Sequence, residues 1–294
     1  MKLNVKSKSL SAAAQQDRCL SWLYGHRIGR MLLWPLVQRP VSEFIGHLLD
    51  TKLSRLLVPA CIRWMQIPME DYEKQDYKSY NDFFTRHIKK EKRPFPEDED
   101  VLVSPCDGAV TVYHIAPDTH FKIKHTMYTM ESLLRDRKLA EEYAGGTIIV
   151  LRLQVSDYHR YCYPVSGRKT GNRRIQGVYH TVNPIAFEHY PVFKENTREY
   201  TMIESPVYGK ILQMEVGALC VGRIVNYHER AVVKRGEEKG RFEFGGSTVI
   251  LVLKRGAAEV RHEFWKNSAA EVETPVRMGE SLLSPPCPMP KNPV

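Results

Sequence analysis

The feature that most constrains this chain is a Gly-Gly-Ser-Thr sequence directly before a short apolar strand. Gly245, Gly246, Ser247 and Thr248 are followed by Val-Ile-Leu-Val-Leu at 249–253. Two adjacent glycines permit backbone geometry that other residues resist, and they leave the Gly246 carbonyl with little steric cover. The Ser247 hydroxyl belongs to the very next residue, so it could attack its own chain rather than an outside substrate. The sequence therefore suggests that the chain itself cuts the peptide bond between Gly246 and Ser247.

Positive charge is concentrated near the N-terminus. The 294 residues carry a formal net charge of +9, and residues 1–66 hold ten Lys or Arg against three Asp or Glu, a net of +7. Such charge is typical of proteins that bind nucleic acid or an anionic membrane. Here the basic residues are interleaved with an apolar stripe rather than with exposed stacking aromatics. We therefore expect an anionic membrane surface as a partner and no nucleic acid.

The apolar stripes of the N-terminal region have helical spacing. One begins at Leu20 and is interrupted by Pro35 and Pro40, and a second runs over 44–57 and stops near Pro59. Such stripes pack on a protein core about as often as they lie on lipid. We interpret residues 1–95 as a basic, helical, membrane-associating region.

After residue 100 the pattern changes to short strands rich in Val, Ile and Tyr. Residues 127–138 are expected to form one helix, and residues 259–264 are expected to form a strand. Residues 96–294 are interpreted as the catalytic domain. The predicted fold is α+β, with an N-terminal amphipathic helical region before a mostly antiparallel, sandwich-like β-sheet.

The cysteines and apolar runs indicate the compartment. Six cysteines are scattered without a CxxC pair, which argues against a zinc module and favours a reducing cytoplasm. The sequence shows no apolar run followed by a cleavage site, so we expect no signal peptide. The apolar stretch 31–37 is too short to span a bilayer. We expect a peripheral protein on the cytoplasmic side of the cell membrane.

An acid, a base and a nucleophile occur in the order Asp107, His159, Ser247. Serine is a weak nucleophile until a base takes its proton, and the base works best when a carboxylate orients it. Each residue also has a structural interpretation, since Asp-Gly at 107–108 is a common hairpin turn. Together the three residues indicate nucleophilic chemistry.

Six motifs in the same order resemble those of phosphatidylserine decarboxylases. They are SYNDFFTR at 79–86, VSPCDG at 103–108, DYHR at 157–160, TVNP at 181–184, EVGA at 215–218 with VG at 221–222, and FGGST at 244–248.

The resemblance implies a self-processing, pyruvoyl-dependent enzyme of phospholipid biosynthesis. Ser247 would attack the Gly246 carbonyl, and the resulting ester would eliminate to dehydroalanine and hydrolyse to a pyruvoyl group. The products would be a β chain (1–246) and an α chain (247–294), held together as a heterodimer that could pair further. Asp107 would orient the base, and His159 or a neighbour would remove the hydroxyl proton. His159 would donate the proton in the second reaction.

The pyruvoyl group derived from Ser247 would form a Schiff base with the substrate amine and accept electrons as carbon dioxide leaves. The resemblance requires no metal and no diffusible cofactor.

One departure from the family pattern concerns the base. The family commonly has His-Arg-x-His, and the second histidine is Cys162 here, an HRxC variant. Either His159 serves both reactions, or His180 fills the gap, or Cys162 acts as a thiolate. Gly245 replaces a leucine that is frequent in the family, and with Thr248 it is a supporting candidate.

Two other functions remain open from the sequence. The substrate could be another serine phospholipid or a soluble amino acid, although the basic N-terminal helices favour lipid. The chain could also be an unprocessed lipid-binding homologue that lost maturation with the histidine at position 162.

Overall fold

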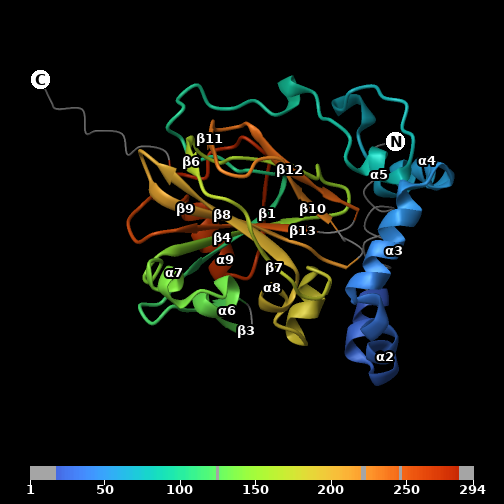
Figure 1. Ribbon diagram of the computed structural model, residues 1–294, viewed down its shortest axis with the longest axis horizontal. Helices are drawn as coiled ribbons and strands as arrows, with labels where there is room; N and C mark the ends of the chain where they lie inside the picture. The colour runs from blue at the N-terminus through green and yellow to red at the C-terminus, as the bar shows by residue number, and fades with distance from the viewer. Residues whose placement is uncertain (1–17, 124–125, 220–222, 245–246, 285–294) are drawn as a thin grey trace, which may run out of the picture.

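Helices precede sheets along the chain. The computed structural model describes residues 18–123, 126–219, 223–244 and 247–284. Its helical N-terminal region leads into a mostly antiparallel β domain (Figure 1). The predicted α+β fold is confirmed.

Short helices form the N-terminal region. Residues 18–25 are helical. The following elements are α2 (Arg27–Leu36), α3 (Arg39–Asp50), η1 (Lys52–Leu57), α4 (Val58–Met65), η2 (Met69–Asp71), α5 (Tyr80–Phe84) and η3 (Lys90–Lys92). Pro40 and Pro59 occupy the first turns of α3 and α4, where a backbone N–H would lack a helical partner in any case. These prolines therefore begin helices, whereas the sequence analysis expected them only to interrupt or end helices.

A nine-stranded antiparallel sheet forms the centre of the β domain. Its strands are β1 (Gly108–His114), β4 (Thr147–Leu153), β6 (Gly167–Lys169), β7 (Arg173–Ile175), β8 (Arg198–Ser205), β9 (Gly209–Val216), β11 (Ala231–Val233), β13 (Ser247–Leu253) and β14 (Thr274–Val276). Their order is β11-β6-β8-β9-β13-β4-β1-β14, and β7 pairs with β8 beside this path. The strand that begins at Ser247 therefore lies inside the sheet.

Two smaller sheets complete the β structure. One has the order β10 (Arg223–Asn226), β12 (Glu238–Glu243), β5 (Arg160–Cys162), and the other pairs β2 (His120–Ile123) with β3 (Thr126–Thr129). Side chains of β9 reach the three-stranded sheet, because Gln213 Nε2 donates to the Cys162 carbonyl and Glu215 pairs with Lys239. One face of the large sheet is thus covered by β5 and β12.

Two local predictions in the β domain are wrong. Residues 127–138 form the end of β3, then α6 (Met130–Leu134) and part of α7 (Arg137–Glu141), because Arg135 has a left-handed conformation and Asp136 caps a new helix. The expected strand at 259–264 runs into α9 (His262–Ala269). Val260 and Phe264 are both buried, and a spacing of four fits a helix as well as an alternating strand.

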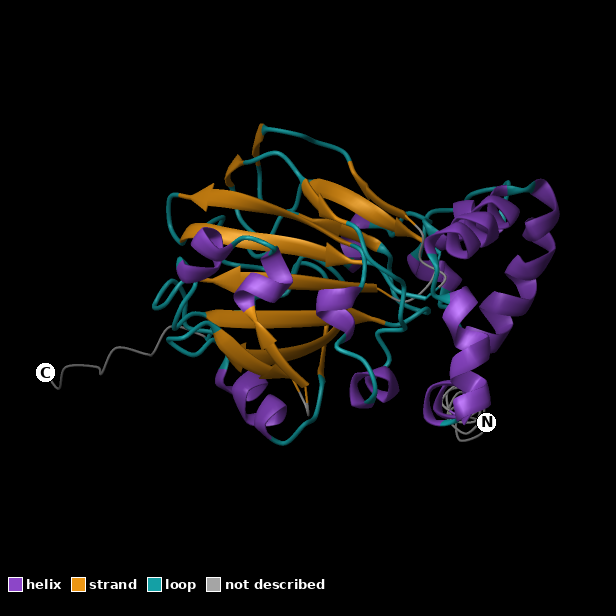
Figure 2. Ribbon diagram, turned by 60° about the horizontal axis from the view of Figure 1, so that its bottom comes forward, coloured by secondary structure: helices purple, strands orange, loops and turns teal. Residues whose placement is uncertain are grey.

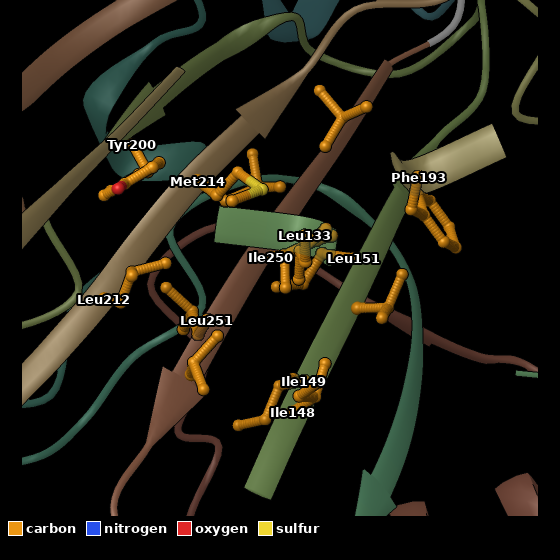
Figure 3. Packing of buried hydrophobic residues seen from close by; sticks show 14 of the residues in the cluster. Leu133, Ile148, Ile149, Leu151, Phe193, Tyr200, Leu212, Met214, Ile250 and Leu251 are labelled. Carbon is orange, nitrogen blue, oxygen red and sulfur yellow. The ribbon is translucent and has the colours of Figure 1, made fainter. Parts of the chain in front are cut away.

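The hydrophobic core surrounds β4 and β13. Every residue of β13 is buried, and Figure 3 shows Ile250 and Leu251 of this strand among Ile149 and Leu151 of β4 and Met214 of β9. Two further helices, η4 (Pro184–Glu188) and α8 (Val192–Glu195), lie in the same domain. A buried strand of this kind explains the uninterrupted apolar run at 249–253.

The helices of residues 27–65 gather at one end of the β domain (Figure 2). A second apolar cluster, which includes Leu49, Val58 and Phe83, extends to Tyr158 and Phe244 of the β domain. Within the described ranges, none of the helices combines the length and the apolar character that a bilayer span requires.

Candidate active site

Ser247 begins the central strand β13. It pairs with Leu153 of β4, and Thr248 pairs with Val216 of β9. Ser247 is fully buried, and its Oγ has no hydrogen-bond partner among the residues that the structure describes. Burial of a hydroxyl without a partner is unfavourable, so the site holds a polar group at a cost in stability. Such a cost is typical of a functional position rather than of a core position.

The side chain of Ser247 lies on the face that β5 and β12 cover. Alternate residues of a strand share a face, so Ser247 and Val249 point the same way, and Val249 pairs with Glu215. Glu215 contacts β12 on that face. Thr248 is buried too, but its side chain points to the opposite face. Gly245 and Gly246 lie outside the described residues, and Phe244 before them has a left-handed φ of 37°.

His159 returns to the same region through a tight turn after β4. The Asp157 carboxylate accepts a hydrogen bond from Gln154 N at 2.7 Å, and Asp157 N donates to the Gln154 carbonyl at 2.9 Å. The His159 carbonyl then accepts from Phe242 N at 2.9 Å. The segment 153–159 therefore contacts the start of β13 through Leu153 and the end of β12 through His159. It holds β12 and β13 at the point where the chain passes from one to the other.

The tautomer of His159 follows from its hydrogen bond. Its Nδ1 lies 2.9 Å from the Asp157 carbonyl oxygen, which can only accept. Nδ1 of the neutral ring therefore carries the proton, and Nε2 carries the lone pair that a general base needs. The ring is buried against Phe84, with the centroids 4.0 Å apart. This contact gives the SYNDFFTR motif a place at the site.

Asp107 lies at the same end of the strands as Ser247, immediately before β1. Arg93 holds its carboxylate with two hydrogen bonds, Nε to Oδ1 at 2.7 Å and Nη2 to Oδ2, and Met278 N donates to Oδ1 at 2.9 Å. The resemblance implied that Asp107 orients the base. The Asp157 carbonyl orients His159 through its contact with Nδ1, and the role of Asp107 stays a prediction. Sequence reasoning selected neither this carbonyl nor Arg93.

The residue after Asp107 has to be glycine. Gly108 has a φ of 153°, and a Cβ atom at this position would lie 2.7 Å from the Arg152 carbonyl oxygen. Ala109 pairs with Arg152, so β1 lies close to the last residues of β4 here. The Asp-Gly pair thus places the Asp107 carboxylate two strands away from Ser247, about 10 Å across the sheet.

The carboxyl group of Asp157, beside His159, has a perturbed pKa. Burial raises its pKa from 3.8 to about 6, and the negative charge of Asp107 adds to the effect. The two carboxylates are therefore close enough to interact. Only the position of Asp157 beside His159 could have drawn attention to it in the sequence.

The thiol of Cys162 is buried beside the site. Burial raises the pKa of its thiol to about 12, so the group is protonated near neutral pH. Its backbone instead connects the site, because Cys162 N donates to the Pro105 carbonyl at 2.8 Å and its carbonyl accepts from Gln213. These bonds fix the segment that carries Asp107. Burial of the thiol therefore disfavours the thiolate alternative.

The ring of His180 faces the N-terminal region. Its Nδ1 lies 3.4 Å from Tyr24 Oη, the ring stacks on Tyr190 at 4.1 Å, and Nε2 is 3.8 Å from Glu195. Burial lowers its pKa to about 4, so it is neutral near pH 7. None of these ring partners is a candidate catalytic residue.

Asn196 connects the segment around His180 to the end of β9, the strand that pairs with β13. Its amide donates to the carbonyls of His180 and Gly217 at 2.7 and 2.8 Å, and its Oδ1 accepts from His180 N. Gly217 follows the residue of β9 that pairs with Thr248, so it continues the strand beside Ser247. Sequence reasoning did not select Asn196, although it is fully buried and polar.

Substitution of Asp157 by asparagine tests the electrostatics of this turn. The folded protein holds a proton on Asp157 more tightly than the unfolded chain does, so ionisation lowers stability as the pH rises from 3.8 to about 6. We expect Asp157→Asn to raise the free energy of unfolding by about 1–3 kcal/mol at pH 7.5, with no gain at pH 3.5. Urea denaturation in a Ser247→Ala background measures this difference.

The matched control for that experiment is Asp118→Asn. Asp118 is exposed, and a hydrogen bond from His120 N lowers its pKa. This variant should gain no stability at pH 7.5. An equal gain in both variants would show that loss of any carboxylate, rather than the burial of Asp157, produces the effect.

Comparison with known proteins agrees with this arrangement. A family model described as phosphatidylserine decarboxylase matches residues 80–284, which include Asp107, His159 and Ser247. Phosphatidylserine decarboxylase proenzyme 2 of Clostridium acetobutylicum is 40% identical over 264 residues, covering 90% of this chain and 90% of that protein.

Two further relatives are phosphatidylserine decarboxylase proenzymes of Clostridium botulinum and Clostridium perfringens. They are 38% identical over 272 residues and 37% identical over 269 residues. Each alignment covers 90% of this chain and 92% of the relative. The chain therefore belongs to the phosphatidylserine decarboxylase family.

Proposed function

We propose that this chain is a proenzyme that cuts itself between Gly246 and Ser247 and then converts phosphatidylserine to phosphatidylethanolamine and carbon dioxide. The observation that carries the proposal is the buried Ser247 hydroxyl, which lacks a partner among the described residues and begins a central strand after two glycines. The family of the chain supports the substrate and the reaction.

In the cleavage step, His159 acts as the base. Its Nε2 accepts the proton of Ser247 Oγ, Oγ bonds to the Gly246 carbonyl carbon, and the C–N bond to Ser247 breaks as the imidazolium gives the proton to the nitrogen, which leaves an ester. Removal of the Ser247 α-proton then breaks the Cβ–Oγ bond, so that the Gly246 carboxylate leaves and residue 247 becomes dehydroalanine, which water hydrolyses to the pyruvoyl group and ammonia. The Asp157 carbonyl stabilises the imidazolium that forms, because it accepts the Nδ1 hydrogen bond throughout. The pair of Arg93 and Asp107 fixes the start of β1, at the same end of the sheet as Ser247.

The two chains remain associated after cleavage. The α chain would contain β13, which pairs with β4 on one side and β9 on the other, and β14, which pairs with β1. The interface is therefore the interior of a sheet and its core, and separation would expose both. This supports a tightly bound heterodimer of the α and β chains.

The residues around Ser247 fit a small prosthetic group without hydrogen-bond donors. The site is buried and offers Oγ no described partner, which suits a pyruvoyl group derived from Ser247. Such a group supplies a carbonyl that takes up electrons as the substrate loses carbon dioxide. His159, once protonated, returns a proton to the substrate carbon, and Phe84 excludes water from one face of its ring.

We further propose that the protein binds peripherally to the cytoplasmic face of the cell membrane. Large apolar side chains of the N-terminal region are exposed, and Met31, Leu53 and Leu56 are each 75% exposed. The same region carries the excess of basic residues. Apolar groups with basic neighbours favour insertion into an anionic lipid surface. This surface also favours a lipid substrate over a soluble amino acid.

Ser247→Ala tests the cleavage. We expect the wild-type protein to separate into two bands on a denaturing gel, and the variant to run as one band, because it lacks the attacking oxygen. The matched control is Ser42→Ala, which removes another buried hydroxyl without a described partner and should leave two bands. Two bands from Ser247→Ala would contradict the proposed bond or nucleophile.

The two histidine candidates can be separated by a pair of variants. We expect His159→Ala to remain uncut, because no other group takes the hydroxyl proton, and His180→Ala to be cut normally. Intact mass spectrometry distinguishes the products. Cleavage in His159→Ala together with an uncut His180→Ala would assign the base to His180 instead.

Membrane binding is tested on the exposed apolar residues. We expect Met31→Ser combined with Trp34→Ser to reduce flotation with phosphatidylserine-containing vesicles at least about tenfold, because both side chains would lie in the lipid interface. The control combines Val232→Ser and Val272→Ser, which are also exposed but lie in the β domain. An equal loss in both proteins would argue against a specific membrane face.

A further inference from the structure

A cavity of about 400 Å³ lies between helix α2 and the β domain. Arg30, Leu33 and Trp34 line it from the helix, and Arg135 and Lys194 line it from the β domain. It is lined by three cationic side chains and by one carboxylate, that of Glu195. Since His180 in its wall is neutral near pH 7, the lining has a net positive charge.

The cations of this cavity lack the carboxylate partners that other basic residues have. Arg93, Arg152 and Arg160 each pair with an acid. By contrast, Arg135 and Lys194 form no ion pair within the described part of the chain. Of their acidic neighbours, Asp136 pairs with Arg173. Glu195 lies 3.8 Å from the neutral His180 ring, and although burial raises the pKa of Glu195, the positive charge of Lys194 acts to lower it.

Two further arginines add to the positive charge. Among the residues that the structure describes, Arg30 donates only to the carbonyls of Tyr24 and Gly25. Behind the wall, Arg198 is fully buried, and within the described ranges it bonds only to backbone carbonyls and pairs with no acid. Burial lowers its pKa to about 10, and the charge of Arg135 adds to the shift. Like charges gathered in this way repel one another, and an anion in the cavity would relieve the repulsion.

The cavity is separate from the candidate active site. From Ser247 the sheet continues through Gly217 and Thr197 to Gly177 at the cavity wall, since Gly217 N donates to the Thr197 carbonyl and Gly177 N donates to Thr197 Oγ1. Three strand spacings correspond to about 14 Å. In a serine phospholipid only a few covalent bonds separate the amine from the phosphate. A substrate reacting at Ser247 therefore does not place its own phosphate here.

The cavity is continuous with the exposed apolar face of α2. Trp34 lines the cavity, yet it is 69% exposed, and Met31 on the same helix is also exposed. A lipid whose chains lie along this face can therefore direct its headgroup inward toward Arg135 and Lys194. Guanidinium and ammonium groups bind phosphate oxygens with charge-assisted hydrogen bonds.

We propose that this cavity binds the phosphodiester headgroup of an anionic phospholipid that is not the reacting substrate. The bound lipid would connect α2 to the β domain, because Arg30 and Arg135 contact it from opposite walls. The site extends the proposed membrane association but does not depend on the reaction at Ser247.

Calorimetric titration of the full-length Ser247→Ala protein with dihexanoyl phosphatidylglycerol, below its micelle concentration, tests the proposal. This headgroup has no amine and cannot mimic the substrate at residue 247. We expect Arg135→Gln combined with Lys194→Gln to weaken binding at least about tenfold. The matched control, Arg255→Gln with Lys266→Gln, removes the same charges from exposed positions elsewhere and should bind like the parent protein.

Two further titrants identify what is bound. Dihexanoyl phosphatidylcholine should bind at least about tenfold more weakly, since its net charge is zero, and inorganic phosphate should also bind more weakly, since it lacks the acyl chains. Equal affinity for either titrant, or an equal effect of both double variants, would overturn the proposal. Because the probe is a monomeric lipid and the protein is uncut, the result is independent of vesicle flotation and of self-cleavage.

The double variant also needs a test of folding. In the wild-type background, Arg135→Gln with Lys194→Gln should still yield two chains on a denaturing gel, because neither residue belongs to the candidate active site. Weak lipid binding in a protein that still cuts itself supports the site. Unchanged lipid binding in that protein contradicts it.

Discussion

The pairing of β13 on both of its edges is the constraint on which the site depends. Its residues from Ser247 to Leu253 pair with β4, and its residues from Thr248 to Val252 pair with β9. Core side chains cover both faces. The backbone of Ser247 therefore cannot move away from the site, and strain in the chain has to fall on residues before it. The left-handed Phe244 lies on that side.

Sequence reasoning selected those candidate site residues whose side chains lie in or beside a strong local sequence pattern. Gly-Gly-Ser-Thr before an apolar run predicted both the candidate nucleophile and the strand that it begins, and the structure confirms the strand. The helical spacing from Leu20 and the short strands after residue 100 were sufficient for the α+β fold. These features are local, so neighbouring residues alone determine them.

The missing parts are contacts between distant segments or contacts of the backbone. Arg93 meets Asp107, and Asn196 meets Gly217, only because the sheet brings these segments together. The carbonyl of Asp157 orients His159, but every residue has a carbonyl, so no sequence signal marks it. Position 162 lacks the histidine that is common in the family, and the fold places it on a buried strand where its backbone bonds hold the segment that carries Asp107.

The buried pair of Glu215 and Lys239 shows how the other side of the cleavage segment is fixed. Lys239 Nζ lies 2.5 Å from Glu215 Oε2 and 2.7 Å from Asn226 Oδ1, and both members of the pair are fully buried. Burial raises the pKa of Glu215 and lowers that of Lys239, so desolvation offsets much of the attraction. A shift of β12 by one residue would leave the ammonium group without these partners. The pair thus fixes the register of β12 against β9, and the chain between Phe244 and Ser247 has to connect two ends that cannot move.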